Sequence, residues 1–174
     1  MELGVWMNTS NLTLRREFRF AMNFWTRVLD MAWYERNDPA CSIQVVEGSS
    51  SLFVSEAIAA RSQLIDKDPF SGSIAFNPKC RMTELDFYLT AIHEVGHVLG
   101  LEHSPNPRSI MYFLNPIDPP FLDERDMKSL AKRYRLRYAS TAVGAVGFQC
   151  QGSRDRVLAP LLRMRSVNES NSER

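Results

Sequence analysis

The sequence contains the stretch His93-Glu94-Val95-Gly96-His97-Val98-Leu99-Gly100-Leu101-Glu102-His103, in which three histidines stand at fixed offsets. His93 and His97 are four residues apart, so on a helix both side chains project from one face on successive turns. Glu94 points about 100° around the helix from His93, beside the space that the two imidazoles share. Gly100 permits the left-handed turn that ends a helix, and the reversed chain can deliver His103 as a third nitrogen.

These residue types at these spacings indicate a metal site. Three imidazoles with one open coordination position form the ligand set of a catalytic zinc ion, whereas structural zinc sites have four protein ligands. His93, Glu94 and His97 alone occur by chance in many helices. The added Gly100 and His103 at their offsets make the zinc interpretation much stronger.

The stretch resembles the zinc signature of the metzincins, and within them of the matrixins, the matrix metalloproteinase group. Ser104 follows the third histidine, as is usual in matrixins, and Met111 resembles the methionine of the Met-turn beneath the metal. Matrixins usually carry proline two residues after this methionine, where this chain has Phe113, so the wall of the specificity pocket is expected to differ. Tyr112 follows Met111 directly, one residue too early for the tyrosine ligand of other metzincins. The resemblance covers about residues 13–137.

The resemblance implies an α+β fold of the three-layer-like αβα metzincin type, with one catalytic domain over residues 1–137. Its expected parts are a twisted mixed sheet with one antiparallel edge strand, a long N-terminal helix, a zinc-binding active-site helix, and a C-terminal helix after the Met-turn. Residues 138–174 lie outside the resemblance and form a basic C-terminal tail, which we expect to be partly disordered.

Apolar periodicity supports several of these elements. Residues 13–33 space their apolar side chains as an amphipathic helix does, and residues 42–46 have the composition of a strand. Residues 3–7 alternate as in a short edge strand. The range 53–64 fits either a short helix or a strand with a loop.

Two helices are predicted around the histidine stretch, one that carries His93 and His97 and one that follows the Met-turn. The zinc helix begins near Thr83, which forms a capping-box pattern with Asp86. Its apolar residues fall on one arc and His93 and His97 lie to one side of it, so one face can enter the core while the ligands face a cleft. Residues 122–134 resemble the last helix of the matrixin catalytic domain.

Residues 72–78 indicate a further strand, ended by proline. In matrixins the strand at this place is the antiparallel edge of the sheet and borders the cleft, so the resemblance implies that its backbone binds an extended substrate. The alternative is that a neighbouring segment covers this edge. The predicted substrate-binding residues are Ile74, Ala75, Phe76, Tyr112 and Phe113.

The resemblance implies a zinc metalloendopeptidase that hydrolyses peptide bonds of protein or peptide substrates. His93, His97 and His103 would hold one zinc ion, and Glu94 would be the general base towards water activated by the metal. The alternative is a catalytically weak, zinc-bearing module that binds or inhibits a protein on the same fold. The intact Glu94 favours the enzyme.

The composition suits one globular domain with some excess length, since 44% of the 174 residues are hydrophobic and the net charge is +1. Acidic residues prevail in residues 1–124 and basic ones in 125–174, which argues against a nucleic-acid platform around the cleft. No apolar run is long enough to cross a bilayer, and the start lacks the features of a signal peptide. We expect a monomer, and the resemblance implies a secreted, extracellular protein, with the extracellular matrix as a keyword of the family.

The cysteines and remaining acids suggest little further metal chemistry. Cys41, Cys80 and Cys150 exclude a dense disulfide framework, and a Cys41–Cys80 bridge or three free thiols fit equally well. The motif uses all three histidines of the chain, so the second, structural zinc of many animal matrixins is not expected. Matrixin loops often hold calcium, for which Asp66 and Asp68 are candidates, although solvated turn acids are the simpler interpretation.

Overall fold

The computed structural model describes residues 2–64, 70–114, 120–134, 136–140 and 146–150. The chain divides into two compact units, Met1–Asp126 and Met127–Arg174. The elements in chain order are β1 (Glu2–Asn8), α1 (Leu12–Leu29), β2 (Ala32–Arg36), β3 (Ile43–Glu47), the 3-10 turn η1 (Ser50–Leu52), β4 (Ala60–Leu64), β5 (Gly72–Phe76), α2 (Glu84–Val98), α3 (Glu124–Tyr134), β6 (Leu136–Ser140) and β7 (Val146–Cys150).

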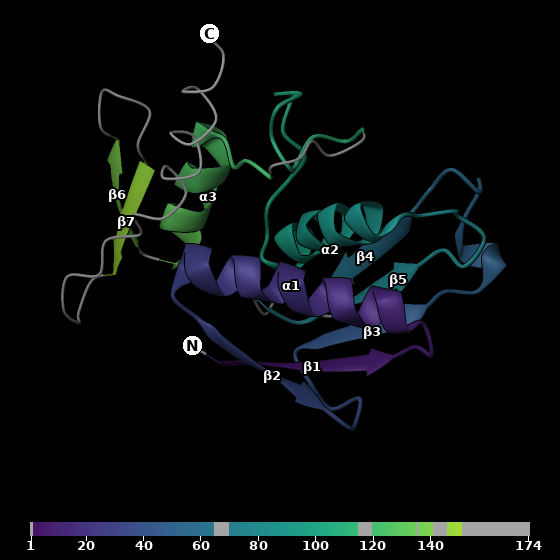
Figure 1. The fold of residues 1–174 in the computed structure, drawn as a ribbon. Coiled ribbons are helices and arrows are strands. Elements are labelled where there is room, and N and C mark those ends of the chain that lie inside the picture. The colour runs from purple at the N-terminus through teal and green to yellow at the C-terminus, as the bar shows by residue number, and fades with distance from the viewer. Residues whose placement is uncertain (1, 65–69, 115–119, 135, 141–145, 151–174) are drawn as a thin grey trace, which may run out of the picture. The chain divides into compact units, whose positions relative to one another are not determined.

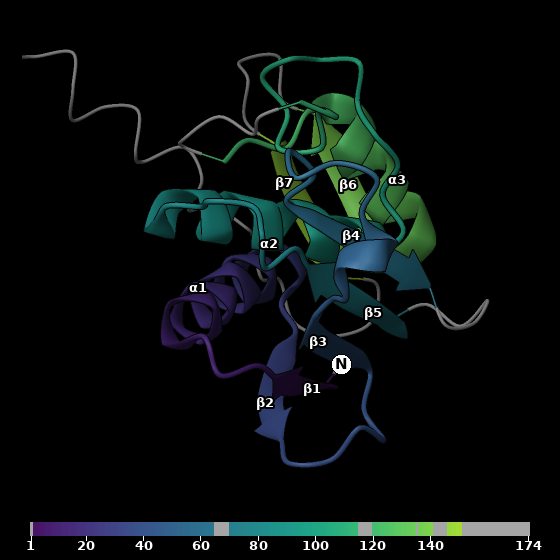
Figure 2. The same ribbon diagram turned by 90° about the vertical axis from the view of Figure 1, so that its right-hand side faces the viewer.

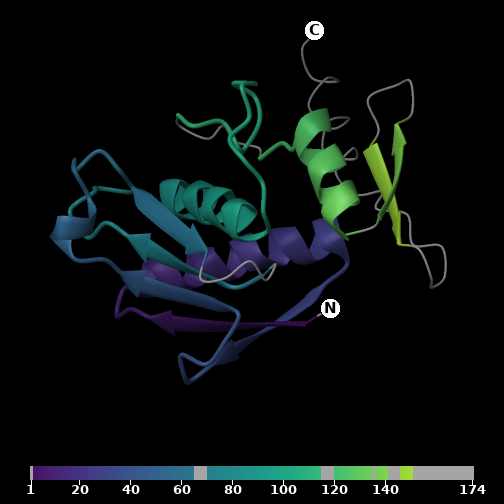
Figure 3. The ribbon, with the colours of Figure 1, turned by 180° about the vertical axis from the view of Figure 1, so that it is seen from behind.

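The first unit is built on a five-stranded sheet with the order β2-β1-β3-β5-β4 (Figure 1). Strands β2, β1, β3 and β5 pair in parallel, whereas β4 pairs antiparallel with β5 and forms one edge. Seen from behind in Figure 3, β1 and β3 lie side by side and run in the same direction. The predicted α+β class and the mixed sheet with one antiparallel edge strand are confirmed.

The edge strand itself is not the one that the sequence predicts. Residues 72–78 were expected to form it, but β5 is interior, with β3 on one side and β4 on the other. The backbone of Ile74, Ala75 and Phe76 therefore lies inside the sheet and cannot add a substrate strand, so this prediction was wrong. The edge strand is β4 (Ala60–Leu64). It lies within residues 53–64, whose pattern fits either a short helix or a strand with a loop. Beyond Ala60 it is largely exposed, as edge strands with polar side chains are.

Strand β1 is also interior, because β2 and β3 pair with it on either side. The alternation in residues 3–7 correctly indicates a strand, but the edge position was wrong. Its buried face consists of Leu3, Val5 and Met7, each at most 4% exposed. A strand with a continuous line of apolar side chains is more stable in the interior of a sheet, where other elements bury these side chains.

Helix α1 is shorter at its C-terminus than the periodicity suggests. It begins after Asn11, whose side chain accepts a hydrogen bond of 3.0 Å from the Leu14 N–H. It ends at Leu29, because Asp30 adopts the left-handed conformation with a φ of 48°. The sequence predicts a helix as far as Trp33, but the chain reverses at Asp30 and enters β2.

Helices α1 and α2 lie on the same face of the sheet (Figure 2). Trp25 of α1 is fully buried, and its indole N–H donates a hydrogen bond of 3.1 Å to the Ile92 carbonyl of α2. Each large apolar side chain buried between these layers contributes roughly 1.5–3 kcal/mol. The largest fully buried side chains are Trp25, Phe18, Phe76, Leu14, Met22, Ile43, Ile74, Ile92, Leu99, Ile110 and Met111.

The second unit contains most of α3 and an antiparallel hairpin of β6 and β7. The sequence pattern predicts no strand there, and residues 138–174 are predicted to be a tail. Residues 151–174, where disorder is predicted, lie outside the described residues. The domain boundary at residue 137 stays a prediction.

The two cysteines of the first unit, Cys41 and Cys80, are free thiols. This agrees with the free-thiol alternative rather than with a bridge between them. Asp66 and Asp68, the calcium candidates, lie outside the described residues. Within the described part of the chain, every helix is too short or too polar to cross a bilayer.

Candidate metal centre

Helix α2 presents the first two histidines, and its ends are defined by local interactions. At the N-terminus the Asp86 N–H donates to the Thr83 hydroxyl oxygen at 3.2 Å, and the Thr83 N–H donates to the Asp86 carboxylate at 2.8 Å. The predicted capping box is therefore present. The helix is thus anchored at a fixed starting point, which determines where His93 and His97 lie along it.

The C-terminus of α2 turns the chain back towards the histidines. Gly100 has a φ of 88°, a left-handed conformation that favours glycine. Its N–H donates to the His97 carbonyl at 2.8 Å, and the Leu101 N–H donates to the Gly96 carbonyl at 2.9 Å. This pair of hydrogen bonds is the Schellman pattern, and the reversal that follows returns His103 to the helix face.

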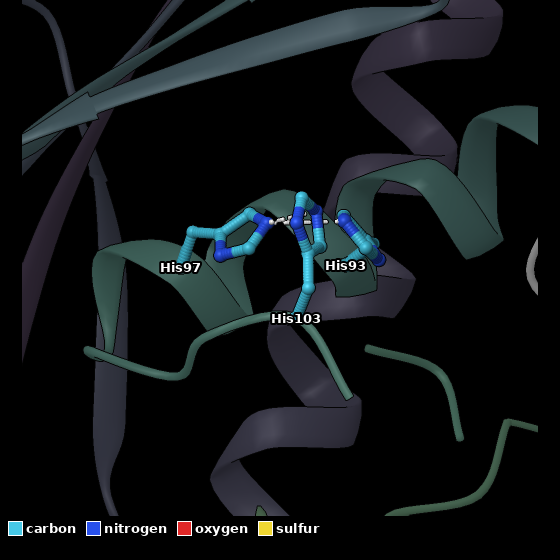
Figure 4. Close-up of side chains that lie close together, drawn as sticks. All are labelled: His93, His97 and His103. Carbon is cyan, nitrogen blue, oxygen red and sulfur yellow. Dashed lines mark hydrogen bonds between the residues drawn. The ribbon is translucent and has the colours of Figure 1, made fainter. Parts of the chain in front are cut away.

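The three histidines converge as the sequence predicts (Figure 4). The Nε2 atom of His97 lies 3.1 Å from Nε2 of His93 and 3.2 Å from Nε2 of His103. One ligand atom from each ring falls within 4.8 Å of the others. Two nitrogens bound tetrahedrally to one zinc ion at 2.0–2.1 Å are about 3.3–3.4 Å apart, so this spacing fits a shared ion.

Hydrogen bonds at the opposite ring nitrogens support the same conclusion. Nδ1 of His93 lies 2.7 Å from the Ile110 carbonyl, and Nδ1 of His97 lies 2.8 Å from the Leu101 carbonyl. A carbonyl only accepts, so each Nδ1 carries the proton and each Nε2 of a neutral ring presents a lone pair. Two lone pairs facing each other at 3.1 Å repel unless a cation lies between them. The donor set therefore fits a divalent metal ion.

The electrostatics keep the rings in the form that binds metal. Burial lowers the pKa of His93 to about 4, although its hydrogen bond with Ile110 opposes the shift. Burial also lowers the pKa of His103. Both rings are therefore neutral near pH 7, as ligation requires.

Glu94 lies on α2, directly after His93. It is only 8% exposed. Burial raises the pKa of its carboxyl, and hydrogen bonds with the side chain and the backbone of Ser62 on β4 oppose the rise. A carboxylate whose pKa moves towards neutrality is better suited to take a proton from water and return it.

Met111 packs beneath the ligands, as a Met-turn residue would. It is fully buried, and a Cβ added at Gly96 would lie 2.5 Å from its sulfur and 3.3 Å from the Trp25 ring. Gly96 lies between the two helical ligands in sequence, so its missing side chain lets Met111 approach the helix closely. The preceding carbonyl, of Ile110, holds the His93 ring.

A buried polar network fixes the segment that follows His103. The Ser104 hydroxyl donates to the Asp123 carboxylate, and the Ser109 hydroxyl donates to the Asp126 carboxylate at 2.6 Å. Asp123 and Asp126 also exchange hydrogen bonds through their N–H groups at 3.0 Å and 2.9 Å, which caps α3. The network connects the loop after the third ligand with the Met-turn and the start of α3.

The remaining predicted residues lie just after the Met-turn. Tyr112 is half-buried and its ring centroid lies 4.8 Å from that of Phe113, which is 60% exposed. Ser104 and Tyr112 form an isolated bridge, so this segment runs beside the one that carries the third ligand.

Sequence reasoning missed Ser62 and the acids of the network. The Asp123-x-x-Asp126 spacing is a capping-box pattern and could have been noticed. Ser62 carries no such signal, because only the pairing of β4 with β5 brings it near Glu94.

Comparison with known proteins agrees with this geometry. The family model described as Matrixin matches residues 5–135. Human matrix metalloproteinase-15 is 42% identical over 52 residues, which cover 28% of this chain and 8% of that protein. An archaemetzincin of Methanocaldococcus jannaschii is 33% identical over 99 residues, or 56% of this chain and 52% of that protein. An archaemetzincin of Pyrococcus abyssi is 63% identical over 27 residues, or 16% of this chain and 14% of that protein.

The similarity thus spans about half the length of one of these relatives and a much smaller share of the other two. The family match, by contrast, extends over most of this chain and includes the complete histidine stretch and the Met-turn. The chain belongs to the matrixin family.

Proposed function

We propose that this chain is a zinc-dependent endopeptidase in which Glu94 is the general base. The observation that carries the proposal is the convergence of three Nε2 atoms at metal-ligand spacing, with two of the opposite Nδ1 atoms bound to carbonyls. The names of the relatives, a matrix metalloproteinase and two archaemetzincins, support the same class of activity.

Each of these residues has a separate role in the proposed peptide hydrolysis. His93, His97 and His103 would hold a zinc ion, which would lower the pKa of water and polarise a carbonyl. Glu94 accepts the proton of the attacking water and later delivers it to the leaving amine. The buried rings of His93 and His97 stay oriented through their carbonyl partners, so the protein contributes a preorganised site.

The free edge of β4 is the proposed binding strand for the substrate backbone. The Asn77 N–H donates to the Ala59 carbonyl, so residues 59, 61 and 63 direct their backbone groups towards β5. The N–H and C=O groups of Ala60, Ser62 and Leu64 consequently point to the free edge. An extended peptide can add there as a further strand.

The side chain after the cleaved bond is proposed to contact an apolar surface beyond the Met-turn. Phe113, Leu114 and Phe121 are each more than half exposed. The Ile110 N–H donates to the Phe121 carbonyl at 2.7 Å, which holds this aromatic near the turn. An exposed apolar surface of this kind favours an apolar substrate side chain.

The first experiment is metal analysis and a protease assay on one purified sample. We expect about one zinc per chain, and cleavage of casein or a quenched fluorescent peptide that stops with a chelator and returns with zinc. Mass spectrometry of the products would identify the preferred bonds. Stoichiometric zinc without any chelator-sensitive cleavage would contradict the proposed activity.

The role of Glu94 is tested by Glu94→Ala. We expect this variant to retain zinc, because the three imidazoles remain, and to lose roughly 10²–10⁴-fold in kcat. Glu102→Ala is the matched control, since Glu102 precedes another ligand but its side chain is 84% exposed and pairs with Arg125. Comparable activity in Glu94→Ala and the wild type would refute the general-base role.

A further inference from the structure

Strand β5 shows which face of the sheet is turned towards α2. A Cβ added at Gly72 of this strand would lie 2.9 Å from a methyl carbon of Val98 in α2. Gly72 therefore faces α2, and so does Ile74, which follows two residues later and is fully buried. Ala75, the next residue, consequently faces away from α2.

Arg61 of β4 lies on the face of the sheet that is turned away from α2. It pairs with Ala75 of β5, and paired residues of neighbouring strands direct their side chains to the same face. Beyond β5 the row continues with Val46 of β3, and in the adjacent row Gln63 pairs with Ser73. These neighbours of Arg61 in the sheet are all uncharged.

The guanidinium group of Arg61 is available to a further partner. The side chain is exposed. The ion pairs formed among the described residues are all made by other arginines. Arginine is positively charged at neutral pH and binds carboxylates with its planar fork of donors. Arg61 therefore places a positive charge without a neighbouring carboxylate on the strand that is proposed to bind substrate.

A peptide that adds to the free edge of β4 would bring a side chain directly beside Arg61. The backbone groups of Arg61 are directed towards β5, so with an antiparallel peptide it would form a non-hydrogen-bonded pair. In such pairs the Cα atoms are about 4.5 Å apart and the two side chains are closest. Since peptide side chains alternate between the faces, every second one lies on the face of Arg61.

We propose that Arg61 is a specificity-determining residue that selects an acidic substrate side chain on the sheet face turned away from α2. This inference rests on the proposed function, since it needs a substrate that adds to the β4 edge. Arg61 thus adds a preference for negative charge to the apolar preference proposed for the surface beyond the Met-turn. The substrate class is a peptide with aspartate or glutamate near the cleaved bond.

The first test moves a single glutamate through a quenched fluorescent peptide, with glutamine at the same position as the uncharged reference. For the zinc-loaded wild type we expect kcat/KM to be about two- to fivefold higher with glutamate at one position, as for an exposed ion pair. The difference should lie in KM, because the pair forms equally in the ground state and the transition state. It should be much smaller at the two adjacent positions, whose side chains face α2, and should decrease at high salt.

Variants of Arg61 test whether this residue causes the preference. Arg61→Ala should bring the glutamate-to-glutamine ratio of kcat/KM at that position to about one. Arg61→Glu should make lysine preferred to glutamate there, and Arg61→Lys should keep most of the wild-type preference. Arg27→Ala is the matched control, because it removes another exposed arginine, from α1, and should leave the ratio unchanged.

Binding of the same peptides to Glu94→Ala, measured by fluorescence anisotropy, needs no catalysis. We expect the glutamate peptide to bind about two- to fivefold more tightly than the glutamine peptide, and Arg61→Ala in this background to remove the difference. Absence of peptide binding would contradict the inference.

The outcomes distinguish the two proposals. Equal ratios in the wild type and Arg61→Ala, or an equal glutamate preference at adjacent positions, would overturn the role of Arg61 and leave the endopeptidase proposal intact. Absence of metal-dependent cleavage by the wild type would overturn the proposed activity. The anisotropy measurement would then still decide whether Arg61 selects an acidic peptide.

Discussion

The three histidines differ in how firmly the protein holds them. His93 is buried and His97 half-buried, and each has a carbonyl partner for Nδ1, whereas His103 is exposed at the end of the reversed chain. The carbonyls select the tautomer in which Nε2 carries the lone pair and faces the other two histidines. Two of the proposed ligands are therefore preorganised by α2 and its surroundings, and the position of the third depends on the loop that returns to them.

At the same scale, Asp126 makes stability depend on pH. Burial raises the pKa of Asp126 from 3.8 to about 6, although the Ser109 hydroxyl opposes the rise. The native protein therefore holds this proton up to about pH 6, while the unfolded chain releases it near pH 4. The stabilisation is complete below about pH 4 and is lost as the pH rises through 6.

Asp126→Asn should remove this dependence. An asparagine can still accept hydrogen bonds but does not ionise. The free energy of unfolding of the variant, relative to that of the wild type, should therefore rise by on the order of 2 kcal/mol between pH 4 and pH 7. Urea unfolding of the metal-free chains across this range measures the difference. Glu124→Gln, an exposed change two residues earlier, serves as the control. Parallel pH profiles for Asp126→Asn and the wild type would contradict the assignment.

Among the elements, α2 carries the most constraints. Its capping box sets the start, its Schellman turn sets the end, and Trp25 fixes its middle through the Ile92 carbonyl. The Met-turn packs against Gly96, on the same helix. His93 and His97 are consequently held by a helix that is fixed at both ends and in its middle.

Gly96→Ala should destabilise the protein, because Met111 packs closely against Gly96. Alanine favours a helix by about 1 kcal/mol over glycine, but the new Cβ would lie 2.5 Å from the buried Met111 sulfur. Overpacking of this kind costs about 1–3 kcal/mol, so a net loss of about 1 kcal/mol and a Tm lower by about 2–4 °C are expected. In a Met111→Ala background the same substitution should no longer destabilise. A Tm above that of the wild type for Gly96→Ala alone would contradict this expectation. It would show that the helix propensity of alanine outweighs the clash of its Cβ with the Met111 sulfur.

For the whole molecule, the candidate metal centre connects segments that are far apart in the sequence. The ligands come from α2 and the returning loop, the carbonyl that orients His93 comes from the Met-turn, and buried acids at the start of α3 hold that turn. An ion bound at this point therefore stabilises the folded state as a whole, because the unfolded chain has no preformed site.

Zinc should raise the thermal stability of the whole chain. At a free concentration 100 times the Kd, binding adds about 2.7 kcal/mol, which corresponds to a Tm higher by about 5–11 °C for a chain of this size. Differential scanning calorimetry of the metal-free protein with and without zinc measures the shift, and a chelator should reverse it. His103→Ala should abolish most of the shift while leaving the metal-free Tm almost unchanged, because His103 is exposed. An equal shift in that variant would exclude the three-histidine site.

The sequence by itself determined the cluster of three histidines, because His93, His97 and His103 come together through local geometry. A helix of fixed pitch and a glycine turn bring them together within eleven residues, and the capping box and α1 follow from short-range patterns too. Only the tertiary structure decided which strand forms the edge, because pairing partners far apart in sequence compete for the same position in the sheet. For the same reason Ile74, Ala75 and Phe76 were wrongly placed at the cleft, and the contact of Ser62 with Glu94 was not foreseen.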